Sequence, residues 1–355
     1  MIKNILIVKY GSVGDIVNAV PAVRHLRESL PEAKIYWLVK EAFAGLVEDA
    51  DFIDGIVEYR SGGGFPGRAV LELVKNLRRL EIDTVIDFQG LLKSALIGFL
   101  SGAKNRFCFP YTREFSSILY TRRMGKQRGA CHAVQENLSV VEELTGRKIE
   151  GRGDISIDLK PEVLERAAAL LKSHIITDSP IVVISPSSRW PSKMWAAEKF
   201  SALADLLVTG IDAAVILTGA AGDVGYVESI KNGMRAGAVN LAGRTDLKML
   251  AGVIKLSDLV VSCDSGPMHM ACALGVPVAA VFGPTDPSYT GPYGENSIVV
   301  RAETRCAPCR KRKCAGMTCM DGVSVGDVYQ GALEIFRGAA LRVNDKKPGR
   351  EAAAT

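Results

Sequence analysis

The turn DSGP, residues 264–267, offers the clearest site for chemistry in this sequence. The apolar run DLVVSC before it predicts a buried strand, and MHMACALGV after it predicts a helix. Pro267 stands in the first turn of that helix, where proline is tolerated. The backbone amides between Gly266 and His269, together with the Ser265 hydroxyl, suit a pyrophosphate.

Two side chains of this turn leave alternatives open. Asp264 would crowd a phosphate, because like charges repel, and therefore either fixes the turn or binds a sugar hydroxyl. His269 is either a structural histidine within the helix or a ligand contact. The sequence predicts an anion site here with both questions unresolved.

A second strand–loop–helix pattern, ISPSSRWPSKMWAAEKF, supplies hydroxyls and a cation. Ser185, Ser187 and Ser188 follow the apolar run, and Lys193 stands just ahead of a helix predicted to begin near Trp195. A lysine beside a helix N-terminus is a good phosphate ligand. The alternative is an ordinary solvated lysine.

The first apolar run also ends in a turn, KYGSVGD. Gly11 and Gly14 allow the backbone to turn tightly and to approach a ligand. Asp15 falls in the first turn of the following helix, where the helix dipole favours a carboxylate. It is therefore either a helix cap or a general base for an acceptor hydroxyl. The glycine spacing does not match the dinucleotide fingerprint G-x-G-x-x-G.

The elements that must position these turns alternate between strands and helices. In the first half we predict helices at Ile16–Leu30 and Gly67–Leu80, between the strands NILIVKY, KIYWLVK, GIVEY, TVIDFQG and NRFCFP. The second half repeats the alternation with IVVISPS, AAVILTG, VNLAG, LVVSCD, VPVAAVFG and SIVVRA. Continuous apolar strands between helices predict βαβ units and parallel sheets covered on both faces.

Two doubly wound α/β domains follow from this alternation. We expect the boundary near residues 174–180, with a first domain at 1–175 and a second at 176–342. The last helix is predicted at Ser324–Leu341, and the polar tail 343–355 is predicted to be disordered. In such sheets ligands bind beyond the carboxyl ends of the strands, where the three turns described above lie.

The composition excludes several classes of protein. The 355 residues are 48% hydrophobic and 23% charged, which fits two folded cores and excludes a disordered chain. The net charge of +5 is mild, so no nucleic-acid partner is expected. The sequence has no apolar run of about 18 residues, and its first apolar run is too short for a signal peptide. We expect a cytoplasmic protein whose eight cysteines are reduced.

Two further segments have alternative interpretations. Tyr111–Gly129 is either a solvated helix and loop or a surface for anionic groups. Its cations are Arg113, Arg122, Arg123, Lys126 and Arg128. A cysteine segment with the spacing C-x2-C-x4-C-x4-C forms either reduced thiols in a disulfide-capable loop or a metal site. Its members are Cys306, Cys309, Cys314 and Cys319.

Several stretches together resemble the ADP-heptose:lipopolysaccharide heptosyltransferases of glycosyltransferase family 9. They are KYGSVGDIVNAVPAVRHLRESLPEAKIYWLV, DFQGLLKSALI, CDSGPMHMACALGVPVAAVFGPTDPSYTGPYG and the cysteine segment. They stand in the family's order, the similarity covers about residues 2–340, and DSGPMHMACALGVPVAAVFGPTDP is highly specific to the family. The cysteine segment is more similar to the heptosyltransferase II type than to the I type.

The resemblance implies a GT-B fold, in which two doubly wound Rossmann-like domains face a central cleft. It implies an inverting transfer of L-glycero-D-manno-heptose from ADP-heptose to a lipid A–Kdo or heptose acceptor of the lipopolysaccharide inner core. The first domain would bind the acceptor and the second would bind ADP-heptose. Because the acceptor is a lipid, we expect peripheral contact with the cytoplasmic face of the inner membrane.

The resemblance also assigns residues. Asp15 matches the family's proposed catalytic base, and Lys193 matches its diphosphate-binding lysine. The resemblance places Thr245 and Leu247 at the adenine pocket and Asp223 near the ribose. The donor-binding residues that we predict are Gly14, Ser187, Lys193, Asp223, Thr245, Leu247, Asp264, Ser265, Gly266, Pro267 and His269. The acceptor-binding residues that we predict are Arg60, Lys93, Arg113, Arg122 and Arg123.

The implied chemistry needs neither a cofactor nor a metal. Asp15 would deprotonate the acceptor hydroxyl, while Lys193 and the amides after Asp264 would take up the charge that develops on ADP. The sequence Asp49–Asp51 has the form D-x-D, but it reads as a structural loop. Two alternatives are a family 9 transferase with a different sugar or acceptor, and a non-catalytic protein that binds nucleotide sugars.

Overall fold

The computed structural model describes residues 2–59, 66–174 and 179–345. The chain divides after Asp158 into two compact units. We predicted the boundary at residue 175, after the helix α6 (Pro161–Lys172). The helix α6 instead belongs to the second unit, because it packs against α9 (Leu247–Lys255). Gly252 allows this close approach, since a Cβ there would lie 2.7 Å from Ala167.

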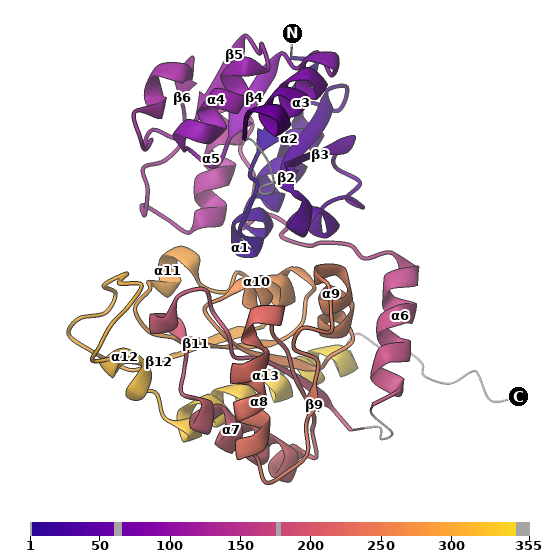
Figure 1. Cartoon of the computed structure of the whole chain (residues 1–355), viewed down its shortest axis with the longest axis vertical. Coiled ribbons are helices and arrows are strands. Elements are labelled where there is room, and N and C mark those ends of the chain that lie inside the picture. Colours follow the sequence, from indigo (N-terminus) through magenta and orange to yellow (C-terminus); the bar gives the residue numbers. More distant parts are fainter. Residues whose placement is uncertain (1, 60–65, 175–178, 346–355) are drawn as a thin grey trace, which may run out of the picture. The chain divides into compact units, whose positions relative to one another are not determined.

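The first unit is built on a six-stranded parallel sheet in the order β3-β2-β1-β4-β5-β6 (Figure 1). The strands are β1 (Asn4–Val8), β2 (Lys34–Lys40), β3 (Gly55–Tyr59), β4 (Thr84–Asp87), β5 (Asn105–Cys108) and β6 (Arg122–Arg123). The first five match the predicted strands, whereas β6 was not predicted. The strand order reverses between β1 and β4, so their carboxyl ends form the place where a ligand is expected.

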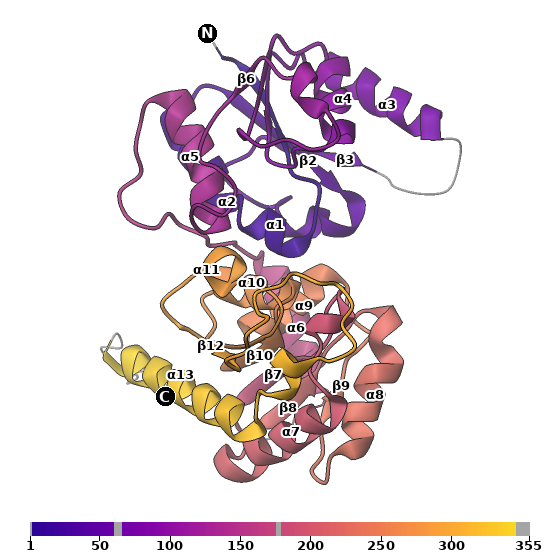
Figure 2. The ribbon, with the colours of Figure 1, turned by 90° about the vertical axis from the view of Figure 1, so that its left-hand side faces the viewer.

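Helices cover both faces of this sheet. Figure 2 shows α2 and α5 on one side of it and α3 and α4 on the other. The α-helices are α1 (Val13–Val17), α2 (Val20–Ser29), α3 (Pro66–Arg79), α4 (Leu92–Leu100) and α5 (Ala133–Thr145), with 3-10 turns η1 (Glu41–Leu46) and η2 (Ser116–Leu119). The predicted helix Ile16–Leu30 is two helices. It breaks after Val17 because Pro21, which has no amide hydrogen, lies in the first turn of α2.

The second unit repeats this design. Its six-stranded parallel sheet has the order β12-β11-β10-β7-β8-β9, and all of its strands were predicted. The strands are β7 (Ile181–Ser185), β8 (Ala214–Leu217), β9 (Val239–Asn240), β10 (Leu259–Cys263), β11 (Val278–Phe282) and β12 (Ser297–Arg301). The order reverses between β7 and β10. Every residue of β10 and β11 is buried, as their continuous apolar runs indicated.

The remaining elements complete the second unit. They are η3 (Pro191–Lys193), α7 (Ala197–Ile211), η4 (Ala221–Asp223), α8 (Val224–Gly233), α10 (Gly266–Ala273), α11 (Pro287–Thr290), α12 (Thr318–Asp321) and α13 (Val325–Asp345). The helix α13 packs on α7 and β12 and extends beyond its predicted end at Leu341. Residues 346–355 of the predicted tail lie outside the described residues. No helix in the described part of the chain is long and apolar enough to cross a membrane.

Candidate active site

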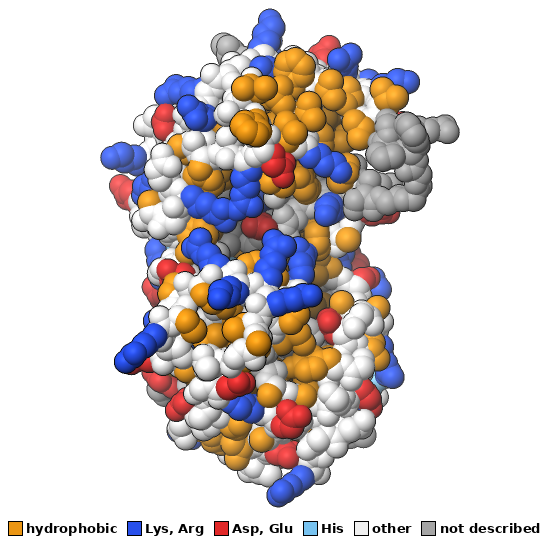
Figure 3. Space-filling view, turned by 60° about the vertical axis from the view of Figure 1, so that its left-hand side comes forward, with side chains coloured by type: hydrophobic (Ala, Val, Ile, Leu, Met, Phe, Trp, Pro, Cys, Tyr) orange, Lys and Arg blue, Asp and Glu red, His pale blue; other side chains and the backbone are white. Residues whose placement is uncertain are grey.

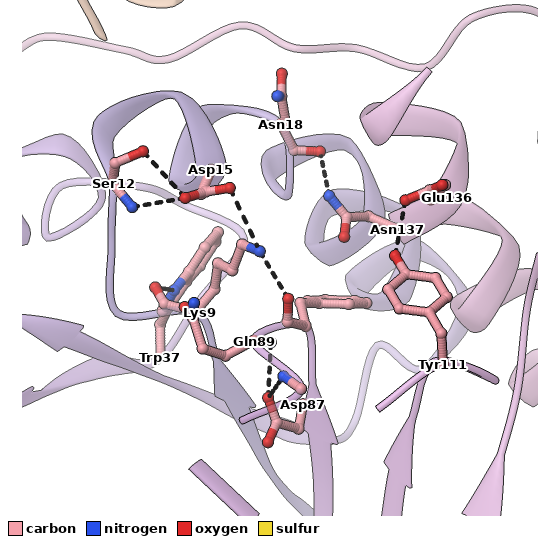
Figure 4. A network of polar contacts seen from close by, with 12 residues as sticks. Lys9, Ser12, Asp15, Asn18, Trp37, Asp87, Gln89, Tyr111, Glu136 and Asn137 are labelled. Carbon is pink, nitrogen blue, oxygen red and sulfur yellow. Dashed lines mark hydrogen bonds and ion pairs between the residues drawn. The ribbon is translucent and has the colours of Figure 1, made fainter. Parts of the chain in front are cut away.

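Asp15 lies in the first turn of α1, just beyond the carboxyl end of β1 (Figure 4). Its Oδ2 accepts hydrogen bonds from the Ser12 amide at 2.8 Å and the Ser12 hydroxyl at 3.0 Å. Its Oδ1 lies 3.7 Å from Lys9 Nζ, and the side chain is 49% exposed. The carboxylate therefore caps the helix and still faces solvent, so the two roles that the sequence left open are compatible.

Lys9 is a residue that the sequence analysis missed. Its ammonium donates to the Phe88 carbonyl oxygen at 2.6 Å, and Trp37 Nε1 donates to the Lys9 carbonyl oxygen at 3.1 Å. Lys9 thus joins the end of β1 to the end of β4 and faces Asp15 (Figure 4). The available signal was a lysine closing a buried apolar strand, where a charge is costly unless it is paired.

Gly11 gives the turn between Lys9 and Asp15 its close packing. Its φ is +151°, and a Cβ at this position would lie 2.5 Å from the ring of Phe43. Any other residue would therefore collide with an aromatic side chain. Gly14, the other glycine of the turn, is buried within α1.

Asp87 is a fully buried carboxylate at the end of β4, beside Val8 of β1. Its Oδ1 accepts from the amides of Gln89 at 2.7 Å and Gly90 at 3.0 Å, and its Oδ2 accepts from the Tyr120 hydroxyl at 2.6 Å. Burial raises the pKa of Asp87, although these hydrogen bonds act in the opposite direction. Asp87 fixes the loop that provides the Phe88 carbonyl to Lys9, and the sequence analysis gave it no role.

In the second unit, Lys193 and Asp264 form an ion pair at the reversal point between β7 and β10. Lys193 Nζ lies 2.6 Å from Asp264 Oδ2, and the two side chains are only 15% and 5% exposed. The Thr285 hydroxyl donates to the same carboxylate oxygen. Lys193 Nζ also lies 4.6 Å from the centre of the Trp190 ring. Asp264 therefore holds the lysine in place, in keeping with a role in fixing the turn.

The local structure around Lys193 corrects one prediction. Lys193 ends the 3-10 turn η3, and α7 begins at Ala197 rather than near Trp195. Trp195 is instead buried, and its Nε1 donates to the Val323 carbonyl oxygen at 3.2 Å. The residues on either side of Trp195 have extended backbone. Lys193 is therefore positioned by Asp264 and not by the N-terminus of α7.

The start of α10 lies directly after Asp264. Ser265 is the N-cap and Pro267 lies in the first turn, as predicted. The first amides of a helix have no acceptor within the helix, so they are available to an anion. Ser188 Oγ donates to the Asp264 carbonyl oxygen at 3.1 Å, and Ser187 Oγ is buried with no hydrogen-bond partner among the described residues. Hydroxyls, amides and a lysine thus lie at the carboxyl-terminal edge of the second sheet.

The cysteine segment supports this site through its backbone. Ser192 Oγ donates to the Lys311 carbonyl oxygen at 2.6 Å, and the Arg312 guanidinium lies 5.3 Å from the Trp190 ring. Trp190 and Arg312 were not predicted as site residues. The described part of the chain contains no group of three or more His, Cys, Asp or Glu arranged to hold a metal ion.

The sequence profile of glycosyltransferase family 9 (heptosyltransferase) matches residues 70–319. The chain belongs to glycosyltransferase family 9. Lipopolysaccharide heptosyltransferase 1 of Escherichia coli K12 is 27% identical over 316 residues, covering 84% of this chain and 93% of that protein. Lipopolysaccharide core heptosyltransferase OpsX of Haemophilus influenzae is 26% identical over 301 residues and 84% of each chain.

Solved structures of family 9 proteins share the fold. E. coli ADP-heptose lps heptosyltransferase II has a TM-score of 0.81 at 19% identity, covering 95% of this chain and 99% of that chain. E. coli heptosyltransferase WaaC with ADP has a TM-score of 0.73 at 26% identity, covering 94% and 99%. The two α/β units of the family 9 enzyme described here are therefore those of a GT-B glycosyltransferase.

The predicted adenosine-binding residues follow the neighbouring strands of the second sheet. Asp223 lies in η4 after β8, and its Oδ2 accepts from the Ala220 amide at 2.9 Å. Thr245 and Leu247 follow β9, at the beginning of α9. Because parallel strands end at the same sheet edge, these residues share the edge that carries Lys193. Gly14 is the one predicted donor residue that lies in the first unit.

The predicted acceptor-binding cations are scattered over the first unit. Lys93 lies in the first turn of α4, and its ammonium lies 4.5 Å from the centre of the Tyr59 ring. Arg113 is exposed on the loop before η2. Arg122 and Arg123 form the exposed strand β6, where Arg122 pairs with Glu143 at 2.9 Å. These two arginines lie on an edge strand, whereas one of the two interpretations placed them in a solvated helix and loop. Arg60 lies outside the described residues.

Proposed function

We propose that this enzyme transfers L-glycero-D-manno-heptose, with inversion, from ADP-heptose to the lipid A–Kdo or heptose inner core of lipopolysaccharide. Its family and its curated relatives support a heptosyl transfer. A WaaC structure with ADP-2-deoxy-2-fluoro heptose, 26% identical to this chain, supports the donor. The observation that carries the proposal is the pairing of Lys193 with Asp264 directly before the start of α10.

The second unit would hold the departing diphosphate. An ammonium has three donors, and Asp264 occupies only part of this capacity, so Lys193 can also donate to a phosphate oxygen. The amides at the start of α10 and the buried hydroxyl of Ser187 would add further hydrogen bonds. These groups are held before the reaction begins, which is the arrangement that best stabilises a developing negative charge.

Asp15 in the first unit would act as the general base. Its exposed carboxylate is fixed by Ser12 and faces Lys9, so it can take a proton from an acceptor hydroxyl without reorienting. Inversion then follows from attack on the face of the heptose opposite the diphosphate. Charge stabilisation by Lys193 and the amides involves no divalent cation, so we expect activity to survive EDTA.

Because the acceptor is anchored in a lipid, we propose that the enzyme works at the cytoplasmic face of the inner membrane. Lys93, Arg113 and Arg123 are exposed cations of the first unit that would meet phosphates and carboxylates of the acceptor. Arg122 already shares its charge with Glu143, so we expect it to contribute less than Arg123.

Product analysis tests this function. The purified enzyme is incubated with ADP-heptose and a series of truncated lipopolysaccharides, and the products are identified by mass spectrometry and linkage analysis. We expect one heptose to be added to one truncated acceptor, and Asp15→Asn to form this product far more slowly. Transfer only from another nucleotide sugar would indicate a different family 9 activity. ADP-heptose binding without transfer to any acceptor would indicate a non-catalytic protein.

A further inference from the structure

The first unit exposes a set of large apolar side chains that a folded core would normally bury. Phe115 is 91% exposed and Ile118 is 82% exposed. We call the set the apolar face: Leu71 on α3, Leu92, Leu96 and Phe99 on α4, and Phe115 and Ile118 at η2. Figure 3 shows a broad hydrophobic area on the first unit with Lys and Arg side chains at its border.

The apolar face is continuous because its elements pack together. The helix α4 contacts both η2 and α3. Leu92, Leu96 and Phe99 are spaced by four and three residues, which places them on one side of α4. The opposite side packs on β4, where a Cβ on Gly98 would lie 3.2 Å from Val85. Both sides of α4 are thus apolar, and the core accounts for only one of them.

In the segment around η2 a polar side chain is buried and nearby apolar side chains are exposed, which is the reverse of the usual arrangement. Ser116 is fully buried with no hydrogen-bond partner for its Oγ among the described residues, while its neighbours Phe115 and Ile118 face solvent. Glu114 and Phe115 both have left-handed φ angles, of 56° and 58°, which non-glycine residues seldom adopt. The backbone therefore holds the aromatic ring outward.

Among the described residues beside the apolar face, cations outnumber carboxylates. Arg78 Nε donates to the Leu100 carbonyl oxygen at the end of α4, and the Arg106 guanidinium lies 5.4 Å from the Phe99 ring. Lys93 follows Leu92 directly, and Arg113 lies two residues before Phe115. The described acidic residues next to the face in sequence are Glu72 and Glu114, and the Glu114 carboxylate accepts from the Leu92 amide.

We propose that the apolar face docks onto a bilayer that contains anionic lipids. Exposed aromatic and aliphatic side chains partition into the interfacial region, and flanking lysine and arginine side chains reach the headgroups. A large exposed apolar patch with a charged border marks an interaction surface, and the border charge favours an anionic partner. The proposal rests on the proposed lipid-anchored acceptor for its purpose, since the face belongs to the acceptor-binding unit.

Vesicle flotation of the full-length enzyme tests the proposal. Wild type is compared with the double variant Phe115→Ser/Ile118→Ser on vesicles of phosphatidylcholine with and without phosphatidylglycerol. We expect wild type to prefer the anionic vesicles and the double variant to lose at least about tenfold in partitioning, because two large apolar side chains no longer bury. Equal binding of the two proteins, or equal binding to both kinds of vesicle, would overturn the proposal.

Leu206→Ser provides a matched control. Leu206 lies on α7 of the second unit and is also an exposed leucine, at 39%. We expect this variant to float like wild type. An equal loss in Leu206→Ser would show that binding follows general hydrophobicity rather than the apolar face.

A fluorescent variant reads insertion directly. In Phe115→Trp the new indole occupies a position that is 91% exposed, so the fold has no reason to change. Brominated lipids should quench its emission and vesicles should shift it to the blue, while Leu206→Trp stays unaffected. Emission that does not respond to brominated lipids would contradict insertion.

Two further measurements separate this inference from its competitors. Sedimentation tests whether a second copy covers the apolar face. A wild-type dimer that dissociates in Phe115→Ser/Ile118→Ser, with no binding of wild type to vesicles, would overturn the proposal.

Turnover on a deacylated acceptor should be the same in the double variant and wild type, whereas turnover of the double variant on vesicle-embedded acceptor should fall. Flotation needs no donor sugar, so it decides the docking surface even where the proposed transfer fails.

Discussion

Each unit places a lysine beside a carboxylate where the order of its strands reverses. The two lysines are similarly buried, at 11% and 15% exposed, but the two carboxylates differ. Lys9 and Asp15 are 3.7 Å apart and the carboxylate is 49% exposed, whereas Lys193 and Asp264 are 2.6 Å apart and 15% and 5% exposed. The exposed carboxylate keeps its contact with solvent, as the proposed general base requires. The buried carboxylate is committed to its lysine and serves to position it.

A second comparison concerns the fourth strand of each sheet, counted in chain order. Asp87 ends β4, the fourth strand of the first sheet, and Asp264 follows β10, the fourth strand of the second. Both carboxylates are buried. Asp87 is satisfied by amides and hydroxyls, whereas Asp264 pairs with a cation. The same topological position therefore stabilises a loop in one unit and positions a lysine in the other.

The largest effect is expected at the exposed carboxylate. Asp15→Asn keeps an oxygen that can accept from Ser12 but cannot take a proton, so kcat should fall by roughly two to four orders of magnitude. ADP affinity should change little. Asp51→Asn is the control, because Asp51 is an exposed loop carboxylate that lies 3.5 Å from Arg24. Wild-type turnover in Asp15→Asn would show that the exposed carboxylate is not the general base.

Stability should show the opposite ranking. Asp264→Asn leaves the Lys193 charge largely buried without its partner, so the free energy of unfolding should fall by about 3 kcal/mol. Asp15→Asn should cost less than about 1 kcal/mol, because its carboxylate is 49% exposed and Lys9 keeps its hydrogen bond to the Phe88 carbonyl oxygen. Urea unfolding followed by circular dichroism measures both values. Equal losses would mean that the difference in burial has no energetic consequence.

Donor affinity should depend on the lysine of the second unit. Lys193→Ala removes a charge-assisted contact to the diphosphate, so calorimetry should show ADP binding weakened by about 10- to 100-fold. Lys231→Ala, at an exposed position of α8, should bind ADP like wild type. Unchanged affinity in Lys193→Ala would place the diphosphate elsewhere.

The smallest effect is a pH dependence at Asp87. Because burial raises the pKa of Asp87, the folded state holds its proton more tightly than the unfolded state does. This contribution to stability is complete at low pH and is lost as pH rises through the raised pKa. Asp87→Asn does not titrate, so its stability relative to wild type should rise with pH. Urea unfolding of both proteins across the acid and neutral pH range measures the difference in their free energies of unfolding. A difference that does not change with pH would contradict a raised pKa of Asp87.

The strands and the turns that carry Asp15, Lys193 and the start of α10 were predictable from the sequence. Buried parallel strands need continuous apolar runs, and each turn interrupts such a run with glycine, proline or polar residues. These signals are local in the sequence, so they can be recognised without any knowledge of the fold. Family resemblance added roles to the same positions, because the motif residues are also adjacent in the chain.

Other features of the site were decided by tertiary structure. Lys9 meets the Phe88 carbonyl, Thr285 meets Asp264 and Lys311 meets Ser192, and each contact joins residues far apart in the chain. No local pattern predicts such a contact, since its energy depends on which strand ends the fold brings together.

Tertiary structure also decided how deeply each carboxylate of the site is buried. Whether a carboxylate is exposed like Asp15 or nearly buried like Asp264 depends on the side chains packed around it, and not on its neighbours in sequence. The sequence by itself determined two α/β sheets with polar turns at their edges. Only the packed fold decided which carboxylate stays in contact with solvent and which one holds a lysine, because desolvation is a property of the surrounding structure.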